Sequence, residues 1–386
     1  MGVLAVFLGG CQISPAPAPG IAPSSLRRQS AIAKRLGRLR ARMGEERIGA
    51  LLIASLPNVQ YLTGFSGSAG VLLVTAAQAT FFTDSRYDIQ AREEVKESRV
   101  VIAREYAMVA AAKQAARLRE KRIGMEANTV AFAEYQRMKE LLLKKKLVPT
   151  RGLVEALRVE KDEGEIALIR KAVELGSRAL EETLTLLRPG MTELEVAAEI
   201  EYRMRRYGGE RPSFETIVAS GPRAALPHAR ATTRRLRPRE FILMDLGVIL
   251  SGYASDMTRT VFLGKAPAKA ARVYRAVKEA VEAAEQQVAT GRTAESVDKA
   301  ARRVLRRYGY ERYFTHSLGH GLGREVHELP RIGRGQATPL PEGATITIEP
   351  GVYLEGFGGV RIEDVVVVRK GGAELLTPTS KELMEL

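Results

Sequence analysis

Short apolar runs alternate with helix-like patterns from about residue 31 to residue 155. Four runs have the length and composition of strands: 48–55 (IGALLIAS), 69–75 (AGVLLVT), 79–84 (ATFFTD) and 98–103 (SRVVIA). Two segments space their apolar residues as amphipathic helices do: 109–121 and 131–146. This alternation predicts an α/β domain.

A long amphipathic segment follows at residues 158–187 and opens the second part of the chain. Its pattern predicts a helix that begins near Asp162. We place the domain boundary there, which gives an N-terminal domain over residues 31–160 and a second domain over residues 161–386.

The second domain contains an internal repeat, because residues 188–211 match residues 289–312 at a constant offset. The matched positions are Gly190 with Gly291, Thr192 with Thr293, Val196 with Val297, and RRYGGER with RRYGYER. Each copy has a Thr where a helix needs an N-cap and a Gly where the helix ends, and Thr192 with Glu195 predicts a capping box. Two unrelated amphipathic helices could match by chance, but the shared ends favour a duplication with a pseudo-twofold axis.

The composition is that of an ordinary globular protein, with 45% hydrophobic and 27% charged residues. The net charge of +15 is concentrated in two basic runs, at 27–42 and 232–240. Neither run interleaves aromatic residues, and no nucleic-acid-binding motif accompanies them. We therefore interpret them as a solvated basic helix and a basic loop, and expect no nucleic-acid partner.

The first thirty residues have the composition of a tail. Residues 14–25 (SPAPAPGIAPSS) predict a disordered linker, so we expect a disordered segment over residues 1–30. Residues 3–11 resemble a lipoprotein signal ending at Cys11, but no Lys or Arg precedes them and the apolar run is short. The chain has a single cysteine, so nothing requires an oxidising compartment, and no later apolar stretch is long enough to span a membrane. We therefore expect a cytoplasmic protein, with an exported lipoprotein attached through Cys11 as the alternative.

Carboxylates occur inside two apolar strand patterns at 240–250 and 252–263. A turn near Leu250–Gly252 would set Asp245 and Asp256 opposite each other on one face, with Cβ atoms roughly 4.5–5.5 Å apart. Exposed surface aspartates are the alternative, but the apolar neighbours argue for burial. Two bare buried carboxylates at that distance would repel each other.

The same arrangement recurs after the second copy of the repeat, in the apolar segments 344–354 and 358–368. A turn around Gly356–Gly359 places Glu349 and Glu363 on facing strands. Four buried carboxylates, two from each half, would be neutralised by two divalent cations, and a bridging hydroxide would fit between such cations as the nucleophile.

Histidine is concentrated in one stretch, since residues 315–330 hold His316, His320 and His327 of only four histidines in the chain. The fourth is His228. A single histidine is usually structural, but imidazole is the common metal ligand and proton carrier near neutral pH. The glycines that space the cluster let the backbone pass close to a ligand.

Together these residues resemble the five-ligand set of the pita-bread metallopeptidases, a family that includes methionine aminopeptidase, aminopeptidase P and prolidase. The motifs that carry the resemblance are MDLGVILSGYASDMTRT, HSLGHGLGREVHELP, ITIEPGVY and GVRIEDVVVV. Residues 31–155 are similar to the creatinase/prolidase N-terminal domain through NVQYLTGFSGSAG and FFTDSRY. The resemblance implies an α/β (α+β) fold with a creatinase/prolidase-like N-terminal domain and a duplicated pita-bread catalytic domain.

The resemblance also implies the role of each metal ligand. Asp245 chelates one metal ion, His320 and Glu349 bind the other, and Asp256 and Glu363 bridge the two. Oxygen-rich ligation with one imidazole favours Mn²⁺ over Zn²⁺, with Co²⁺ or Fe²⁺ as possible substitutes.

Further positions match the family's cleft. His228, His316 and His327 would line it, hold the substrate and carry protons, and His316, four residues before the ligand His320, favours the Xaa-Pro peptidases over methionine aminopeptidases. Tyr353 and Arg361 match Xaa-Pro peptidase cleft positions, and Glu349 counts as a catalytic group as well as a ligand. One position departs from the pattern, because Arg324 is bulkier than the residue expected there, which leaves the subsite preference open.

The leading hypothesis is therefore an aminopeptidase P-like enzyme, a homodimer with two divalent metal ions, that cleaves short peptides with proline in second position. Prolidase, which acts on Xaa-Pro dipeptides, is the alternative. A methionine aminopeptidase-like enzyme and a catalytically inactive binding protein of the same fold are weaker alternatives. A creatinase-type amidinohydrolase is disfavoured because that branch lacks the metal ligands.

Overall fold

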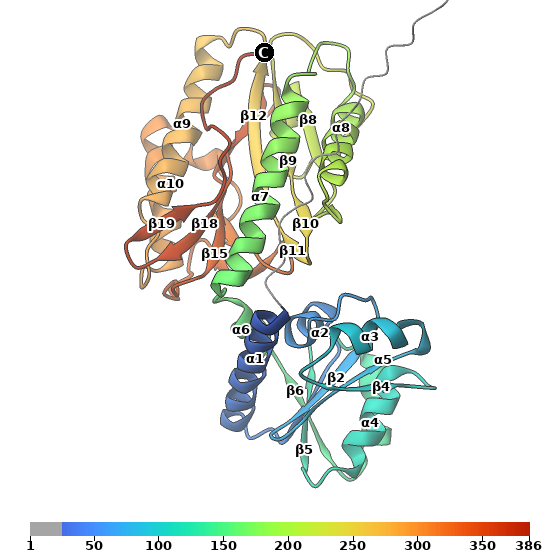
Figure 1. Ribbon diagram of the computed structural model, residues 1–386. Coiled ribbons are helices and arrows are strands. Elements are labelled where there is room, and N and C mark those ends of the chain that lie inside the picture. The colour runs from blue at the N-terminus through green and yellow to red at the C-terminus, as the bar shows by residue number, and fades with distance from the viewer. Residues whose placement is uncertain (1–24) are drawn as a thin grey trace, which may run out of the picture.

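The computed structural model describes residues 25–386 as two domains, one above the other in Figure 1. The N-terminal domain has a six-stranded sheet in the order β4-β3-β2-β1-β5-β6. Its strands are β1 (Ala50–Ile53), β2 (Val71–Thr75), β3 (Ala79–Thr83), β4 (Arg99–Ile102), β5 (Arg122–Glu126) and β6 (Lys146–Thr150). Its helices are α1 (Ser25–Glu45), α2 (Leu56–Thr63), η1 (Ser85–Tyr87), α3 (Asp88–Glu94), α4 (Ala107–Arg117), α5 (Phe132–Leu141) and α6 (Glu155–Arg158).

The predicted alternation is confirmed in this domain, with differences at the helix ends and in the last strands. The four predicted strands are β1 to β4, and the two predicted helices are α4 and α5. Helices α4 and α5 end at Arg117 and Leu141, earlier than predicted, and Leu143 beyond α5 is 84% exposed. Strands β5 and β6 were not predicted, and β6 begins at Lys146, where the helix pattern was expected to end.

Helix α1 is the predicted basic helix. It buries one apolar stripe formed by Ile32, Leu36, Leu39 and Met43. The helix begins at Ser25 and so includes residues 25–30, which were predicted to belong to a disordered tail. Its first buried apolar residue is Ile32. The rest of that tail and Cys11 lie outside the described residues.

The second domain begins with α7 (Glu163–Leu184), whose N-cap is the predicted Asp162. The Asp162 side chain accepts a hydrogen bond from the Glu165 backbone, and the Glu165 side chain accepts one from the Asp162 backbone. The other helices are α8 (Glu193–Arg206), η2 (Gly221–Ala225), α9 (Ala268–Glu285), α10 (Ala294–Tyr308) and η3 (Glu311–Tyr313).

The strands of this domain form several short sheets. Those of the first half are β7 (Arg211–Pro212), β8 (Ile217–Ser220), β9 (Glu240–Leu246), β10 (Val248–Leu250), β11 (Tyr253–Ala254) and β12 (Met257–Leu263). Those of the second half are β13 (Gly319–Gly321), β14 (Glu328–Ile332), β15 (Thr345–Ile348), β16 (Gly351–Leu354), β17 (Gly358–Arg361), β18 (Asp364–Arg369) and β19 (Gly372–Leu375). The sheet orders are β12-β9-β8, β11-β10-β7, β14-β13-β15-β18-β19 and β16-β17.

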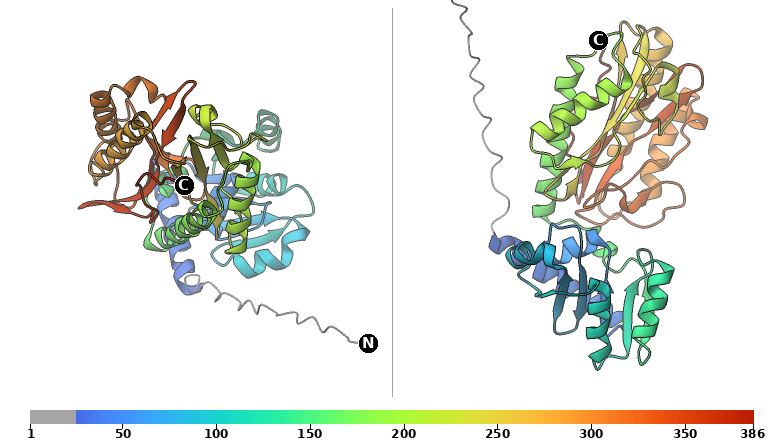
Figure 2. Two further views of the ribbon diagram at one scale, coloured as in Figure 1. Left: turned by 90° about the horizontal axis from the view of Figure 1, so that it is seen from above. Right: turned by 90° about the vertical axis from the view of Figure 1, so that its right-hand side faces the viewer.

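The predicted duplication is visible in the helices. Each half contributes a packed pair, α7 with α8 and α9 with α10, and the second helix of each pair is capped by a threonine, Thr192 or Thr293. Both threonines also form an isolated bridge to a later loop, Thr192 with Arg235 and Thr293 with Pro339. Figures 1 and 2 show the helices on the outside and the strands of both halves between them.

The strand register corrects one prediction. Strand β9 pairs with β12 so that Asp245 lies opposite Thr258, and Asp256 is its diagonal neighbour on the same face rather than its direct partner. The two-residue turn is Ser251–Gly252, both with positive φ, and it lies later along the chain than a direct pairing of Asp245 with Asp256 requires.

The second pair follows the prediction. Strands β15–β18 and β16–β17 share one register, which continues through Glu349 and Glu363 and sets these residues opposite each other. The described residues include no helix that is both long and apolar enough to cross a membrane.

Candidate metal centre

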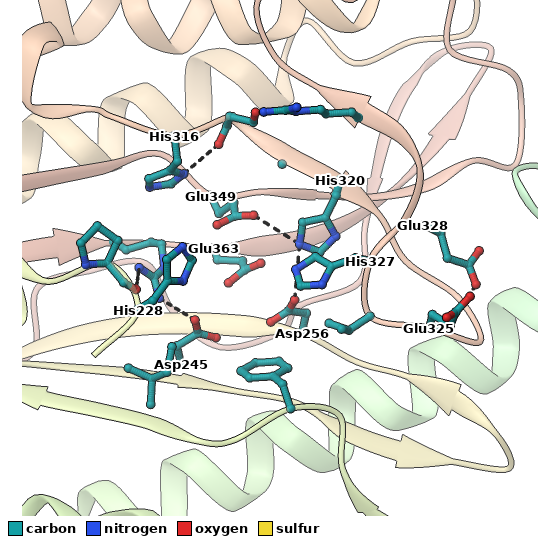
Figure 3. A pocket seen from close by; sticks show the side chains of 18 of the residues that line it. His228, Asp245, Asp256, His316, His320, Glu325, His327, Glu328, Glu349 and Glu363 are labelled. Carbon is teal, nitrogen blue, oxygen red and sulfur yellow. Dashed lines mark hydrogen bonds and ion pairs between the residues drawn. The ribbon is translucent and has the colours of Figure 1, made fainter. Parts of the chain in front are cut away.

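Five side chains from both halves converge between the strands, as Figure 3 shows. Asp245 lies on β9 and Asp256 directly before β12, and both come from the first half. His320 is the central residue of β13, while Glu349 follows β15 and Glu363 precedes β18. We call these five residues the metal cluster. The duplication therefore supplies two carboxylates from each half to one shared space.

His320 lies close to two carboxylates of the metal cluster. Its Nε2 atom lies 3.4 Å from Oε1 of Glu349 and 3.7 Å from Oδ2 of Asp256. One ligand atom each from Asp256, His320 and Glu363 lies within 4.8 Å of the others, which is compatible with shared contact to a metal ion. Glu349 and Asp245 border this trio on either side.

The imidazole of His320 is oriented as a metal ligand. Its Nδ1 atom lies 3.0 Å from the carbonyl oxygen of Gly321, which assigns the proton to Nδ1 and leaves the Nε2 lone pair facing the carboxylates. Burial lowers the pKa of His320 to about 4, so the ring is neutral near pH 7. A neutral imidazole is the form that binds a metal ion.

The glycines beside His320 are required by close backbone packing. A Cβ atom on Gly319 would lie 2.0 Å from the carbonyl oxygen of Thr347 on β15. A Cβ atom on Gly321 would lie 2.0 Å from the carbonyl oxygen of Leu329. The spacing of the histidine motif therefore lets β13 fit between two neighbouring segments while His320 faces the carboxylates.

The carboxylates of the metal cluster are crowded and largely buried. Burial, and then the charges of neighbouring carboxylates, raise the pKa values of Asp256 and Glu363 well above their ordinary range. Burial raises the pKa of Glu349 to about 8. Several carboxylates held this close are stable as anions only beside positive charge.

Asp245 provides a specific test of whether a cation fits. Its Oδ2 atom accepts a hydrogen bond of 2.5 Å from Arg361. Its Oδ1 atom is buried and has no hydrogen-bond partner among the described residues. A buried carboxylate oxygen without a donor is costly, and a metal ion would satisfy it. The oxygen-rich donor set with one imidazole thus fits divalent cations.

Two threonines hold the glutamates in place. The hydroxyl of Thr258, opposite Asp245 on β12, donates to Oε2 of Glu363 at 2.7 Å. The hydroxyl of Thr347 lies 3.3 Å from Oε1 of Glu349. These bonds fix the orientation of the two glutamate carboxylates.

A chain of hydrogen bonds joins the metal cluster to His316. Arg361 donates to the hydroxyl of Tyr353 at 2.9 Å, and this hydroxyl lies 2.9 Å from Nε2 of His316. The Nδ1 atom of His316 lies 2.8 Å from the carbonyl oxygen of Ser317, which assigns the ring proton to Nδ1 and makes Nε2 the acceptor. Burial lowers the pKa of His316 to about 4 and raises that of Tyr353 to about 12, so both groups are neutral at pH 7.

The remaining histidines lie at the open side of the site. His327 is exposed, with its ring centre 4.4 Å from that of His320. His228 is exposed on the side of Asp245 and His316, as Figure 3 shows. All of the candidate residues predicted from the sequence except Tyr353 line one cavity of about 1200 Å³, and Tyr353 contacts that cavity through His316 and Arg361.

The cavity also includes residues that were not predicted from the sequence. Arg331, on β14, lines it and donates from Nε to the hydroxyl of Ser317 at 2.8 Å. Its position four residues after His327, in the same motif, is a sequence signal for a cleft residue. The N-terminal domain contributes Arg158, which donates to Asn58, Glu325 and Glu328. No local pattern identifies Arg158, because its carboxylate partners lie more than 160 residues away.

Two family models match the chain. The model described as metallopeptidase family M24 matches residues 167–370, and that of the creatinase/prolidase N-terminal domain matches residues 35–159. The chain belongs to metallopeptidase family M24. This M24 chain has the fold and the family expected from its sequence motifs, and it is a member of an enzyme family.

Relatives of this M24 chain cover most of its length. A protein named Xaa-Pro dipeptidase from Pyrococcus horikoshii is 38% identical over 89% of the chain and 96% of its own length. A structure titled Xaa-Pro dipeptidase from Bacillus anthracis is 36% identical with a TM-score of 0.90, and the match covers 92% of this chain and all of that one. A structure titled X-Pro aminopeptidase from Thermotoga maritima is 37% identical with a TM-score of 0.83, covering 89% and 99% of the two chains.

Proposed function

We propose that this protein is a metal-dependent Xaa-Pro peptidase, which hydrolyses the bond between an N-terminal residue and a following proline. The observation that carries the proposal is the metal cluster, in which four carboxylates and one neutral imidazole face a common space. Relatives that share most of the chain carry the names Xaa-Pro dipeptidase and X-Pro aminopeptidase, which supports the substrate class.

The proposed metal content is two divalent cations. Asp245 would hold one, His320 and Glu349 the other, and Asp256 and Glu363 would be shared. Four carboxylates balance two such charges, and the oxygen-rich set favours Mn²⁺, with Co²⁺, Fe²⁺ or Zn²⁺ as substitutes. When bound, the pair would polarise the scissile carbonyl and lower the pKa of a water molecule to the neutral range.

The surrounding side chains have roles that follow from their contacts. The hydrogen-bond chain from Arg361 through Tyr353 fixes the ring of His316 at the cavity wall. His228 and His327 are exposed at the open side, where they can contact the peptide and exchange protons with solvent. The Glu349 carboxylate lines the cavity 3.4 Å from His320 and is the group that we assign to accept a proton from the attacking water and to return it to the leaving nitrogen.

Peptide length separates the two candidate activities. The family motifs favour an aminopeptidase P-like enzyme, whereas two features favour the Xaa-Pro dipeptidase alternative. The first is the name of the Pyrococcus horikoshii relative. The second is Arg331, whose guanidinium lines the cavity and could bind the free carboxylate of a dipeptide.

A peptide panel tests both proposals. The purified protein is stripped of metal, reloaded with Mn²⁺, Co²⁺ or Zn²⁺, and given Ala-Pro, Ala-Pro-Ala-Ala and Met-Ala-Ser. An aminopeptidase cleaves both proline peptides, and a dipeptidase cleaves only Ala-Pro. Cleavage of Met-Ala-Ser as fast as Ala-Pro-Ala-Ala would contradict the proline assignment.

The remaining expectations stay predictions. We propose a homodimer, which sedimentation equilibrium can check, and domains over residues 31–160 and 161–386 after an N-terminal tail. The cytoplasmic location and its alternative, a lipoprotein attached at Cys11, depend on residues outside the described part of the chain.

A further inference from the structure

A second cavity of about 1160 Å³ lies where the two domains meet. Its walls come from α1 and α2 of the N-terminal domain, from the start of α7, and from the β10–β11 turn. None of the residues of the metal cluster lines it. Arg324 does line it, and this is the residue that departs from the family pattern in the histidine motif.

The guanidinium group of Arg324 is enclosed but poorly satisfied. It lies 4.9 Å from the ring centre of Tyr253, and its Nη1 atom is 3.5 Å from the carbonyl oxygen of Gly252, at the limit for a hydrogen bond. Its Nε atom is buried without a partner, and no carboxylate among residues 30–386 forms an ion pair with its guanidinium. A buried cation in this state is costly.

Glu165, whose charge acts on Arg324, is already engaged with other side chains. Glu165 accepts a hydrogen bond from the hydroxyl of Tyr253 at 2.9 Å, and its other oxygen lies 3.2 Å from Arg35. Arg35 also pairs with Asp162 at 3.0 Å, yet its Nε atom too is buried without a partner in the described chain. Burial, together with the charges of Arg35 and Arg158, lowers the pKa of Arg324, although Glu165 and Tyr253 oppose this shift.

The backbone beside Arg324 gives the guanidinium room. Gly252 has a φ of +73°, and a Cβ atom there would lie 2.9 Å from Nη1 of Arg324. A glycine at this turn thus leaves room for the guanidinium of Arg324, a residue that lines the cavity beside the β10–β11 turn. A guanidinium edge binds carboxylate or phosphate oxygens through paired hydrogen bonds.

We propose that the second cavity is a binding site for a small anion of the carboxylate or phosphate class, held by Arg324 and Arg35. Such a ligand supplies the negative charge that Arg324 lacks and joins both domains at their contact. The inference does not depend on the proposed peptidase activity, because it concerns a cavity separate from the metal cluster.

The test compares thermal unfolding of the full-length, metal-loaded protein in inorganic phosphate and in succinate, with ionic strength held constant by KCl. The wild type is expected to gain roughly 3 °C in Tm at a hundredfold excess of ligand over its Kd. Arg324→Met keeps the unbranched stem over Tyr253 and is expected to weaken binding roughly tenfold or more. Arg324→Lys keeps the charge but not the fork, and is expected to fall between the two. A response to phosphate alone or to succinate alone supports the site and identifies its ligand class.

Arg38→Met is the matched control, because Arg38 lines the same cavity but is 44% exposed in its side chain and already paired with Glu160. It is expected to leave the anion response nearly unchanged. Anion binding at the metal centre is common to all variants and cancels in the comparison. Equal responses in wild type and Arg324→Met, no response to either anion, or an equal loss in Arg38→Met would overturn the proposal. So would an Arg324→Met protein that melts several degrees below wild type without anion, because Arg324 would then be a structural residue.

Discussion

Glu363 and Asp364 are adjacent in the chain but belong to two different charge clusters. Glu363 faces the metal cluster, where its neighbours are other carboxylates. Asp364 faces the opposite side, where it contacts Arg259 at 2.7 Å and Lys381 at 2.6 Å. We call Arg259, Glu285, Asp364 and Lys381 the Asp364 cluster. Successive residues of an extended segment point to opposite faces, so Glu363 and Asp364 lie in different clusters. The Asp364 cluster contains its own positive charges, whereas the carboxylates of the metal cluster face one another.

The two clusters differ in the source of their positive charge. Burial alone would raise the pKa of Asp364, but Arg259 and Lys381 lower it below its ordinary value. Burial raises the pKa of Glu363, and Glu349 and Asp245 raise it further. Arg259, which is fully buried, also donates to the backbone carbonyl oxygen of Glu363 at 2.7 Å. The Asp364 cluster therefore anchors the strand from which Glu363 reaches the metal cluster, and only the metal cluster requires cations from outside the chain.

The largest expected effect is the loss of activity in Asp256→Asn. A neutral amide oxygen cannot hold two dications together, so cleavage of Ala-Pro should fall by about 10³-fold or more. Steady-state kinetics with added Mn²⁺ measures this loss. Asp364→Asn, compared at a temperature where it is folded, should keep substantial activity. Comparable activity in Asp256→Asn and wild type would remove Asp256 from the site.

The next effect concerns stability and is expected in the Asp364 cluster. Asp364→Asn leaves Arg259 buried without its charged partner, which should cost about 3 kcal/mol in the free energy of unfolding. Urea unfolding in EDTA measures the change. A variant as stable as wild type would show that the backbone acceptors of Arg259 suffice.

A third prediction concerns His316, which contacts the metal cluster only through Tyr353 and Arg361. His316→Ala should lower kcat by roughly 10²-fold, because it removes the acceptor that fixes the Tyr353 hydroxyl beside Arg361, and misplaced side chains at a reaction site typically cost that much. Bound metal, measured by elemental analysis, should stay at the wild-type level. Loss of one metal equivalent would instead make His316 a ligand.

A fourth prediction concerns the pH dependence of the metal-free protein. Because burial raises the pKa of Glu349 to about 8, the folded state binds this proton more tightly than the unfolded chain does. The stabilisation from that proton is present below the ordinary pKa of a glutamate and is lost as pH rises through 8. Between pH 7 and 8.5 the stability in EDTA should therefore fall by about 1 kcal/mol. Glu349→Gln should reduce this dependence without abolishing it, because the pKa values of Asp256 and Glu363 are raised as well. Stability that increased over this range would contradict the sign.

The smallest effect is again on stability, with the opposite sign to that of Asp364→Asn. Two charges about 5 Å apart repel by roughly 3 kcal/mol at an effective dielectric constant near 20, and partial protonation relieves much of this. Asp256→Asn should therefore raise the stability of the metal-free protein by about 1 kcal/mol at pH 7.5, and by less at pH 5. Thermal unfolding in EDTA at both pH values measures it. A lower Tm for the variant at pH 7.5 would mean that the carboxylates do not form one repulsive cluster.

Much of the candidate site could be predicted because its residues lie in short motifs with fixed spacing. The opposition of Glu349 and Glu363 and the cap at Asp162 followed from local pattern. The pairing of Asp245 was misplaced because a turn with positive φ at Ser251 is not evident from residue type alone. The Asp364 cluster was missed because Arg259 and Asp364 are brought together only by the tertiary fold, across 105 residues.

Because the ligands come from both halves of the duplication, metal binding depends on the folded arrangement of the whole catalytic domain. Neither half holds a complete set of ligands, so a dication can recognise only the state in which β9 and β12 of one half are docked against β15 and β18 of the other. Each bound ion then adds a free energy of RT ln(1 + [M]/Kd) to this docked state alone. A higher affinity for metal therefore directly increases the free energy that holds the two halves of the catalytic domain together.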